Sequence, residues 1–252
     1  MMLRSLIGAL AAGLLATAAA GLANAQDIPP NVAAAVADPG RPADDVTLDA
    51  TRKPAELIAF IGLKPGMTIV DVFPGPYWDR LFSKVVGPKG SVIAFQSVEM
   101  GKAEHATIPP EGTAFMPGYP NVIARSGPIN TFSTAHPVDI VWIRQNYHDL
   151  YDPFMGPADV PAFNKAVLKA LKAGGRYVIV DHSAPDGSGL ADTNTTHRID
   201  AAVVKKDMAA AGFAFVGESD VLRNPADTRD KLVFDPSVRG KTDQFVFLFR
   251  KP

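Results

Sequence analysis

The richest group of chemically useful side chains lies in the segment NYHDLY, residues 146–151. It follows an apolar run, so Asn146, His148 and Asp149 come directly after an expected strand. A histidine with an unperturbed pKa of about 6.5 suits proton transfer near neutral pH, and Asp149 could orient His148 or bind an amine. The alternative is that His148 and Asp149 only cap the loop through backbone hydrogen bonds. We expect both to be catalytic, because loops at the edge of a sheet commonly carry functional groups.

A second polar group follows the next expected strand. Asp181 and His182 end that strand, and His197 and Asp200 stand three residues apart at the start of an expected helix, where they would share one face. Three histidines and a carboxylate can bind zinc or iron, so convergence of His148, His182 and His197 would create a metal site with Asp181 or Asp200. The alternative is that these groups are solvated or cap helices, and we assign no metal ligand.

These polar groups need a scaffold, and the apolar pattern of the sequence predicts one. Short apolar runs, typical of strands buried on both faces, occur at residues 67–73, 90–96, 121–127, 137–145 and 176–182. Helices are expected at residues 53–61, 76–86, 161–172 and 196–211. Two further strands are expected at residues 213–222 and 243–251, and the long loop between them leaves room for an antiparallel pair.

Alternating strands and helices predict an α/β fold whose largely parallel sheet is covered by helices on both faces. In such sheets, ligands bind outside the carboxyl ends of the strands, at the point where the strand order reverses. This rule brings four segments around one crevice: residues 71–77, 96–99, 146–149 and 181–182.

The loop after the first of these strands has the sequence DVFPGPYWD, residues 71–79. Nucleotide-binding loops use glycine where the backbone approaches a ligand closely or adopts a positive φ. Here Gly75 stands between Pro74 and Pro76, which have no N–H to donate, although Pro76 suits the first position of a helix. Asp71 could face a ligand or simply cap the neighbouring turn, and we expect the ligand-side role.

Five segments occur in a characteristic order along residues 50–250: LKPGMTIVDVFPG, GPKGSVIAF, VDIVWIRQNYHDLY, LKAGGRYVIVDHSA and AAGFAFV. In this order they resemble the class I S-adenosylmethionine-dependent methyltransferases. The resemblance implies a Rossmann-like, doubly wound, mostly parallel seven-stranded sheet with helices on both faces and a reversed C-terminal strand pair. More narrowly, DVFPG, YHDL and the N-terminal segment are similar to a group of exported bacterial proteins predicted to be methyltransferases. The implied activity is methyl transfer to a small-molecule acceptor.

The resemblance also implies which residues hold the cofactor, S-adenosyl-L-methionine. Its amino-acid portion would lie on the loop after Asp71, and an acidic residue at the end of the second strand would hold its ribose hydroxyls. Gln96 stands at that position and can hydrogen-bond two hydroxyls without charge assistance, and Glu99 could substitute if the loop folds back. The implied cofactor-binding residues are Asp71, Phe73, Gly75, Tyr77, Gln96, Glu99 and Asn146.

The composition and the aromatic residues limit the classes of molecule that the protein is expected to bind. The sequence has 25 Lys and Arg residues against 26 Asp and Glu, so it lacks the clustered positive excess of a nucleic-acid-binding protein. Aromatic side chains either line the mouth of the crevice or cover the edge of the core: Tyr77, Trp78, Tyr147, Tyr151 and Phe154. Such a lining suits a small-molecule acceptor of apolar or aromatic character.

The first 25 residues have the pattern of a cleaved signal peptide. Arg4 provides a basic start, residues 6–22 form an apolar run, and residues 23–25 give the small-x-small cleavage pattern. An uncleaved anchor is the alternative, but the run is at the short end of the roughly 20 residues that span a bilayer. We expect a periplasmic or secreted protein with an irregular N-terminal arm at residues 26–50 and one methyltransferase-like domain at residues 51–252.

Three functions are compatible with these residues. The first and preferred one is an exported S-adenosylmethionine-dependent methyltransferase that acts on a small molecule. The second is a non-catalytic small-molecule-binding protein that kept the fold; the proline-flanked loop, Gln96 and export away from the cytosol favour it, because the cofactor is made in the cytosol. The third is a metal-dependent enzyme built on the His/Asp cluster. The chain has no cysteine, so a metal site could not use thiolate ligands.

Overall fold

The computed structural model describes residues 27–107, 109–156 and 158–252 of the chain. The signal peptide expected at residues 1–25 lies outside these ranges. Within the described ranges, no helix is both long enough and apolar enough to cross a membrane.

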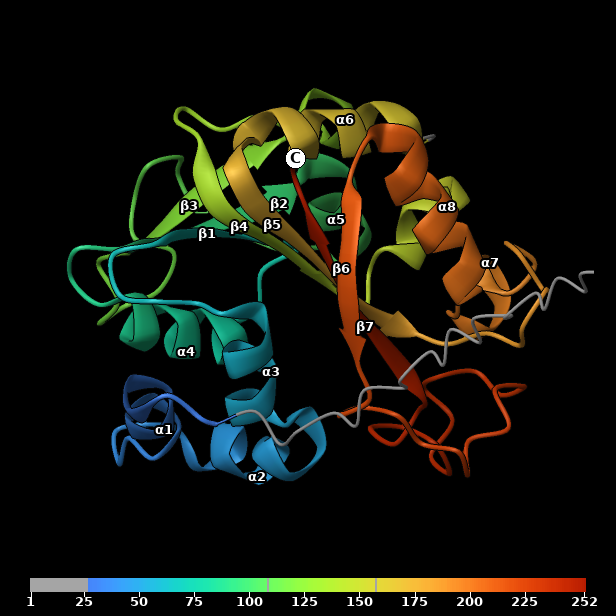
Figure 1. Ribbon diagram of the computed structural model, residues 1–252, viewed down its shortest axis with the longest axis horizontal. Coiled ribbons are helices and arrows are strands. Elements are labelled where there is room, and N and C mark those ends of the chain that lie inside the picture. Colours follow the sequence, from blue (N-terminus) through green and yellow to red (C-terminus); the bar gives the residue numbers. More distant parts are fainter. Residues whose placement is uncertain (1–26, 108, 157) are drawn as a thin grey trace, which may run out of the picture.

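The described residues form one seven-stranded sheet with the order β3-β2-β1-β4-β5-β7-β6 (Figure 1). Its strands are β1 (Thr68–Val72), β2 (Ser91–Ser97), β3 (Val122–Gly127), β4 (Val138–Arg144), β5 (Leu171–His182), β6 (Ala214–Ser219) and β7 (Gln244–Arg250). Strands β1 to β5 are parallel, whereas β7 runs antiparallel between β5 and β6. The doubly wound, mostly parallel sheet with a reversed C-terminal pair is therefore confirmed.

Helices cover both faces of this sheet. Figure 1 shows α1 (Pro30–Val36), α2 (Ala43–Arg52), α3 (Pro54–Ile61) and α4 (Pro76–Val86) on one side, with α6 (Val160–Ala170) and α8 (Ala201–Ala211) on the other. The shorter elements are α5 (Val98–Ala103), α7 (Thr193–Thr196) and the 3-10 helices η1 (Ile129–Thr131), η2 (His148–Tyr151) and η3 (Pro153–Met155). Each face has its own apolar core, so adjacent strand residues such as Ile69 and Val70 are buried on opposite faces. This explains why β1 is a continuous apolar run.

Two predicted helices on the first face begin and end as their sequences suggested. Helix α3 begins with Pro54 and ends at Gly62, which has a left-handed φ of 64°. Helix α4 begins with Pro76, and Gly87 caps its C-terminus with a φ of 66°.

The N-terminal arm differs from the irregular segment that the sequence predicts, because it contains helices α1 and α2. Both helices are too short to show a sustained hydrophobic periodicity in the sequence, and tertiary packing stabilises them. Val32 and Ala35 of α1 are buried in the core beside α3 and α4. Arg41, between the two helices, donates to both carboxylate oxygens of Asp49 on α2, over 2.7 and 2.6 Å.

Two other boundaries differ from the sequence prediction. Helix α6 ends at Ala170, and β5 already begins at Leu171, because a register shift opposite β4 accommodates the extra residues before Arg176. The helix expected at residues 196–211 begins only at Ala201, as α8, and the separate short helix α7 precedes it at Thr193–Thr196. Asp200 causes the new start, since its side chain accepts the Ala202 N–H as an N-cap.

Candidate functional site

The chain turns sharply at the end of β4. Gln145 adopts a left-handed conformation with a φ of 59°, and its N–H donates to the Val180 carbonyl of β5 over 2.7 Å. Left-handed non-glycine residues are costly and cluster at functional sites. The turn leads through Asn146 into η2, and so places His148 and Asp149 at the carboxyl edge of the sheet, both of them buried.

Asp181, near the end of β5, holds His148 in place. His148 Nδ1 lies 2.9 Å from Asp181 Oδ1, and the His148 backbone N–H donates to Oδ2 over 2.8 Å. The backbone N–H of His182 also donates to Asp181 Oδ1, over 2.8 Å. A fully buried carboxylate at Nδ1 places the hydrogen of the neutral ring there, which leaves Nε2 for another partner.

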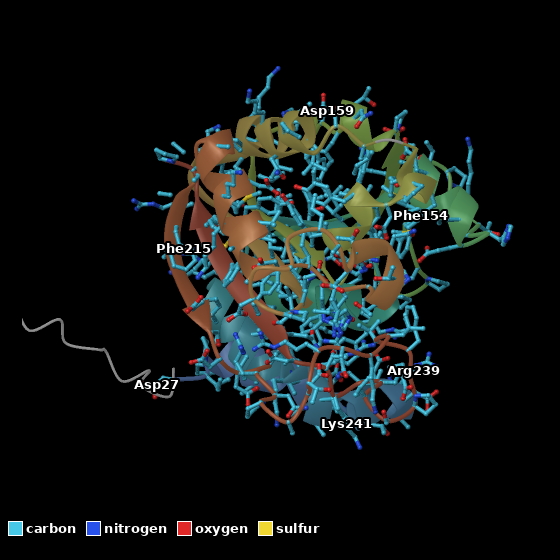
Figure 2. All side chains as sticks on the ribbon, turned by 90° about the vertical axis from the view of Figure 1, so that its right-hand side faces the viewer. Asp27, Phe154, Asp159, Phe215, Arg239 and Lys241 are labelled. Carbon is cyan, nitrogen blue, oxygen red and sulfur yellow. The ribbon has the colours of Figure 1, made fainter. Side chains whose placement is uncertain are left out.

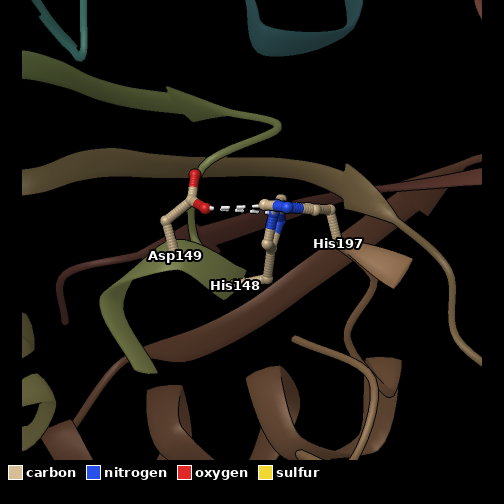
Figure 3. Close-up of side chains that lie close together, drawn as sticks. All are labelled: His148, Asp149 and His197. Carbon is tan, nitrogen blue, oxygen red and sulfur yellow. Dashed lines mark hydrogen bonds and ion pairs between the residues drawn. The ribbon is translucent and has the colours of Figure 1, made fainter. Parts of the chain in front are cut away.

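That other ring atom faces Asp149 and His197 (Figure 3). His148 Nε2 lies 3.3 Å from Asp149 Oδ1 and 3.2 Å from His197 Nδ1. His197 Nδ1 and Asp149 Oδ1 are 3.6 Å apart. Asn146 Nδ2 donates to the second carboxylate oxygen, Asp149 Oδ2, over 2.8 Å. Residues from η2 and from the end of α7 therefore meet in one compact cluster.

Charges within this cluster shift the pKa values of its members. Burial disfavours the imidazolium form of His148, but the Asp181 and Asp149 carboxylates outweigh burial and raise the pKa of His148 to about 10. Burial also disfavours the Asp149 carboxylate, but hydrogen bonds from His148 and His197 outweigh it and lower the pKa of Asp149. Without a bound ligand, His148 therefore keeps its proton at neutral pH, unlike the unperturbed histidine considered from the sequence.

The remaining members of the second polar group have separate partners. His182 Nδ1 lies 2.7 Å from Thr242 Oγ1, and burial lowers the pKa of His182. Asp200 accepts the Ala202 N–H instead of facing the cluster. His197 and Asp200 do not share a helical face, because His197 ends α7 with a left-handed φ of 55° and Asp200 precedes α8.

A cavity of about 380 Å³ opens beside the cluster. Its polar lining comes from α5, from the turn after β4, from the end of β5 and from the end of α7. The titratable and amide side chains of this lining include Glu104, Asn146, His148, Asp149, His182 and His197.

A second cavity, of about 450 Å³, meets the first at Gln145 and Asn146, which line both. It is bounded by helix α2, by the loop after β1 and by the end of β4. Five of the residues expected at a cofactor site line it: Asp71, Phe73, Gly75, Tyr77 and Asn146. The structure thus brings the β1 loop and the NYHDLY segment to one continuous crevice.

The acid of the β1 loop is paired with a second buried acid. Asp71 is the residue before the last of β1 and lies beside Asp79 of α4, and the Gly75 N–H hydrogen-bonds to the Asp71 carboxyl group. Burial raises the pKa of Asp71 well above its usual range, and burial also raises the pKa of Asp79 to about 8. The pair therefore retains at least one proton at neutral pH. Asp71 both caps the turn and lines the second cavity.

The backbone of the β1 loop differs from that of a glycine-rich loop. Phe73 has the left-handed conformation, with a φ of 62°, and its N–H donates to the Phe95 carbonyl over 2.9 Å. Gly75 is extended, with a φ of −139°, and a Cβ added there would meet no atom within 4 Å. The turn therefore does not need the conformational freedom of glycine at residue 75.

Two arginines of the second cavity were not expected from the sequence. The guanidinium carbon of Arg52 lies 4.3 Å from the ring centre of Tyr77, and that of Arg144 lies 5.8 Å from the Trp78 ring centre. Within the part of the chain that the structure describes, neither arginine side chain forms a hydrogen bond or an ion pair. Burial, and then the charge of Arg52, lower the pKa of Arg144 to about 9. An arginine that ends a buried strand, as in DIVWIR, is the signal that could have revealed Arg144.

Gln96 and Glu99 do not line either cavity, although the resemblance placed them at the cofactor. Gln96 is buried at the end of β2, and its Nε2 has no hydrogen-bond partner among the described residues. Glu99 accepts the Ile129 N–H over 3.1 Å and so caps η1. This capping depends on the pairing of β2 with β3, which brings the segments after the two strands together and which local sequence does not determine.

The aromatic residues expected at the crevice divide into two groups. Tyr77 and Trp78 line the second cavity, and Phe154, which lies at the surface in Figure 2, lines the first. Tyr147 and Tyr151 line neither cavity, because both hydroxyls donate to Asp207 of α8. They cover the edge of the core, in agreement with the alternative interpretation.

Comparison with known proteins identifies the fold. No family model and no curated protein matches the sequence. A SAM-dependent methyltransferase from Aquifex aeolicus is 19% identical with a TM-score of 0.51, over 83% of this chain and 99% of that one. An S-adenosylmethionine-dependent methyltransferase from Mesorhizobium loti is 16% identical with a TM-score of 0.50, over 81% and 99%. An arsenic (III) S-adenosylmethionine methyltransferase from Chlamydomonas reinhardtii is 17% identical with a TM-score of 0.51, over 88% and 73%. At these identities the likeness establishes the fold.

Proposed function

We propose that this protein, which has the fold of S-adenosylmethionine-dependent methyltransferases, binds S-adenosylmethionine and transfers its methyl group to a small molecule. The fold supports the proposal, and so does the position of the second cavity. The strand order reverses between β1 and β4, and the cavity is lined by residues at the carboxyl ends of both strands. Open α/β sheets bind ligands at such a point.

The observation that carries the proposal is the presence of Arg52 and Arg144, which have no ion-pair partner among the described residues, beside Asp71. The amino-acid end of the cofactor has a carboxylate and an ammonium group. Guanidinium groups bind carboxylates strongly, and a carboxyl group suits an ammonium. Arg52 and Arg144 also repel one another, since the charge of Arg52 lowers the pKa of Arg144, and a bound carboxylate would relieve that repulsion. Arg52, Arg144 and Asp71 would thus hold the amino-acid end.

The residues of the crevice match the ribose of the cofactor less well than its amino-acid end. Neither Gln96 nor Glu99 lines the crevice, so we assign no residue to the ribose hydroxyls. The proposal therefore depends on the amino-acid end of the cofactor and on the position of the cavity.

The first cavity would hold the methyl acceptor. When bound, the cofactor supplies a methyl group carried on a positively charged sulfur. The acceptor lies within reach because the two cavities meet at Gln145 and Asn146. His148 and Asp149 would contact the acceptor and orient the lone pair of its oxygen or nitrogen by hydrogen bonds. An acceptor with an apolar or aromatic part would also pack against Phe154, which lines the same cavity.

Calorimetric titration of the purified protein with S-adenosylmethionine and S-adenosylhomocysteine tests this proposal. We expect saturable binding of both, and at least about tenfold weaker binding after Arg144→Met, because a charge-assisted hydrogen bond contributes about 1.5–3 kcal/mol. Arg239→Met is the matched control, since Arg239 lies on the surface of the loop between β6 and β7 (Figure 2). Absence of binding heat at millimolar ligand, or equal weakening by the control, would overturn the proposal.

The second candidate function is a non-catalytic binding protein with the same fold. The β1 loop favours it, because Pro74 and Pro76 lack N–H groups and the Gly75 N–H already hydrogen-bonds to Asp71. Incubation with cofactor labelled in the methyl group distinguishes the two functions. Transfer of label to any added small-molecule acceptor supports the enzyme, whereas tight binding without transfer across a broad acceptor set supports the binding protein.

Export is proposed separately, from the sequence of the first 25 residues. If the protein is exported to the periplasm or secreted, the mature chain isolated from cells begins at Gln26.

A further inference from the structure

The cluster of His148, Asp149 and His197 has the spacing of metal ligands. The three atoms that face one another are His148 Nε2, Asp149 Oδ1 and His197 Nδ1, and they are separated by 3.2, 3.3 and 3.6 Å. Ligand atoms that bind one ion at about 2.1 Å, with bond angles near 90–110°, lie about 3.0–3.5 Å apart. An ion could therefore bind all three atoms with small side-chain movements (Figure 3).

Neighbouring groups orient two of the three ligands. Asp181 lies 2.9 Å from His148 Nδ1, which is the arrangement in which a carboxylate fixes a metal-binding histidine and leaves Nε2 for the ion. Asn146 donates to Asp149 Oδ2, which leaves Oδ1 for the ion. Both partners belong to the edge of the sheet, so the ligands are held on a rigid scaffold.

The third ligand is held by a strained backbone. His197 has a left-handed φ of 55°, a conformation that costs energy in a residue other than glycine and persists only where the surroundings impose it. Its ring centre lies 5.2 Å from that of Phe234, in a tilted arrangement. The backbone and this contact direct the imidazole toward His148 and Asp149.

The cluster also leaves room for additional ligands. The side chain of His197 is 28% exposed, whereas those of His148 and Asp149 are 3% and 7% exposed. All three line the first cavity, and Glu104 adds a second carboxylate to its lining. A bound ion would thus keep open coordination positions toward the cavity, which is typical of a catalytic metal site and not of a structural one.

We propose that His148, Asp149 and His197 bind one divalent first-row transition-metal ion, with its open positions facing the first cavity. Two imidazoles and one carboxylate suit zinc or iron, whereas magnesium and calcium prefer oxygen ligands alone. The open positions would bind an oxygen or nitrogen atom of the small molecule in the cavity, so with the ion bound His148 and Asp149 would act on that molecule through the ion. This site stands on its own geometry and does not depend on S-adenosylmethionine binding in the second cavity.

Titration with Co²⁺, a spectroscopic substitute for zinc, tests the proposal on protein first treated with EDTA and desalted. We expect visible absorption bands that saturate at one equivalent of Co²⁺ and disappear when Zn²⁺ is added. His197→Gly removes one ligand and suits the left-handed backbone of residue 197, so the variant should fold and bind Co²⁺ at least about tenfold more weakly. Asp181→Asn should weaken binding by about 10–100-fold, because it replaces the carboxylate that orients His148 and leaves all three ligands in place.

Two exposed loop histidines provide matched controls. His105→Ala and His136→Ala each remove an imidazole outside the cluster, and both should bind Co²⁺ like the parent protein. Far-UV circular dichroism shows whether each variant is folded. The proposal is overturned if the folded parent gives no saturable bands, or if His197→Gly binds as tightly as the parent. Because no cofactor is present, these outcomes do not depend on the methyltransferase proposal.

Discussion

Two carboxyl groups that face each other in the protein interior are the most unusual charge feature at the residue scale. Asp79 is fully buried, and its carboxyl group forms a side-chain hydrogen bond with that of Asp71. Asp71, next to it, lines the second cavity. Two buried carboxyl groups cannot both ionise at low cost, so the folded protein keeps a proton that the unfolded chain releases. The pair couples the stability of the fold to pH at the place where a ligand would bind.

Asp79→Asn should make the stability of the protein less dependent on pH. Burial raises the pKa of Asp79 from 3.8 to about 8 on folding. The associated stability is therefore present below about pH 4 and is lost as the pH rises toward 8, by at most about 1.4 kcal/mol per pH unit. We expect the free energy of unfolding in urea to fall less steeply between pH 5 and 8 in Asp79→Asn than in the parent.

Asp235→Asn is the control for this measurement. Hydrogen bonds from Ser237 at the surface lower the pKa of Asp235, so its titration lies at acidic pH. This variant should keep the parental slope between pH 5 and 8. If Asp79→Asn also keeps that slope, the buried pair does not carry a proton in the folded state.

The residues that could be located from the sequence are those directly after a strand. The carboxyl ends of parallel strands meet at one edge, so the positions of Asp71, His148 and Asp149 in the chain are enough to assign them to one crevice. Arg52 could not be assigned in this way, because it reaches the crevice from α2, an element that the sequence pattern did not predict. The convergence of His148 with His197 depends on a left-handed residue after α7, for which no local sequence signal exists.

At the element scale, the C-terminus of α3 is tied to the sheet by Arg176 of β5. Arg176 Nη1 donates to the carbonyls of Ile61 and Gly62, over 2.6 and 3.0 Å. A Cβ added at Gly62 would lie 2.2 Å from that Nη1. The glycine is therefore required for two reasons, its left-handed φ of 64° and the close approach of the guanidinium group.

Gly62→Ala should destabilise the protein more than Gly66→Ala. Both glycines have a positive φ, but a Cβ at Gly66 would meet no atom within 4 Å. Both substitutions therefore carry the same backbone strain of about 1 kcal/mol, and only Gly62→Ala also displaces Arg176 from its two carbonyls. We expect an additional loss of about 1–3 kcal/mol in the free energy of unfolding, measured in urea. Equal losses in the two variants would show that the Arg176 contact contributes nothing.

Helices and strands with a clear apolar pattern or clear Pro and Gly signals were predicted well, and those that depend on tertiary contacts were not. The apolar runs predicted β1, β2 and β4, and the Pro and Gly signals predicted α3 and α4. Helices α1 and α2 have seven and ten residues, and their stability comes from packing on α3 and α4 and from the Arg41–Asp49 pair. The early start of β5 depends on its pairing with β4, which the sequence of either strand alone does not contain.

At the scale of the whole molecule, the N-terminal helices form one wall of the crevice. Helix α2 contributes Leu48 and Arg52 to the second cavity, although it lies outside the α/β core. Side-chain contacts join this wall to α4, and in one of them Arg80 of α4 donates to Asp45 of α2 over 2.8 Å. Arg41 donates to Asp49 and to the Val36 carbonyl, and Asp49 in turn accepts the Tyr77 hydroxyl of α4 over 2.7 Å. The shape of the crevice therefore depends on a contact between segments that are far apart in sequence.

Arg41→Met should loosen this wall and weaken ligand binding together with stability. Arg41 is buried, and loss of its charge would leave the partly buried Asp49 carboxylate without its main partner, at a cost of about 3 kcal/mol in the free energy of unfolding. Limited proteolysis should cut faster within residues 37–53, and calorimetric affinity for S-adenosylmethionine should fall because Arg52 is no longer held in place. Arg125 of β3 forms an exposed ion pair with Glu111, so Arg125→Met should change stability by less than about 1 kcal/mol and leave both other measurements unchanged. If Arg41→Met behaves like Arg125→Met, α2 keeps its position without Arg41, through the apolar contacts of α1 and the contacts of Tyr77 and Arg80 with α2.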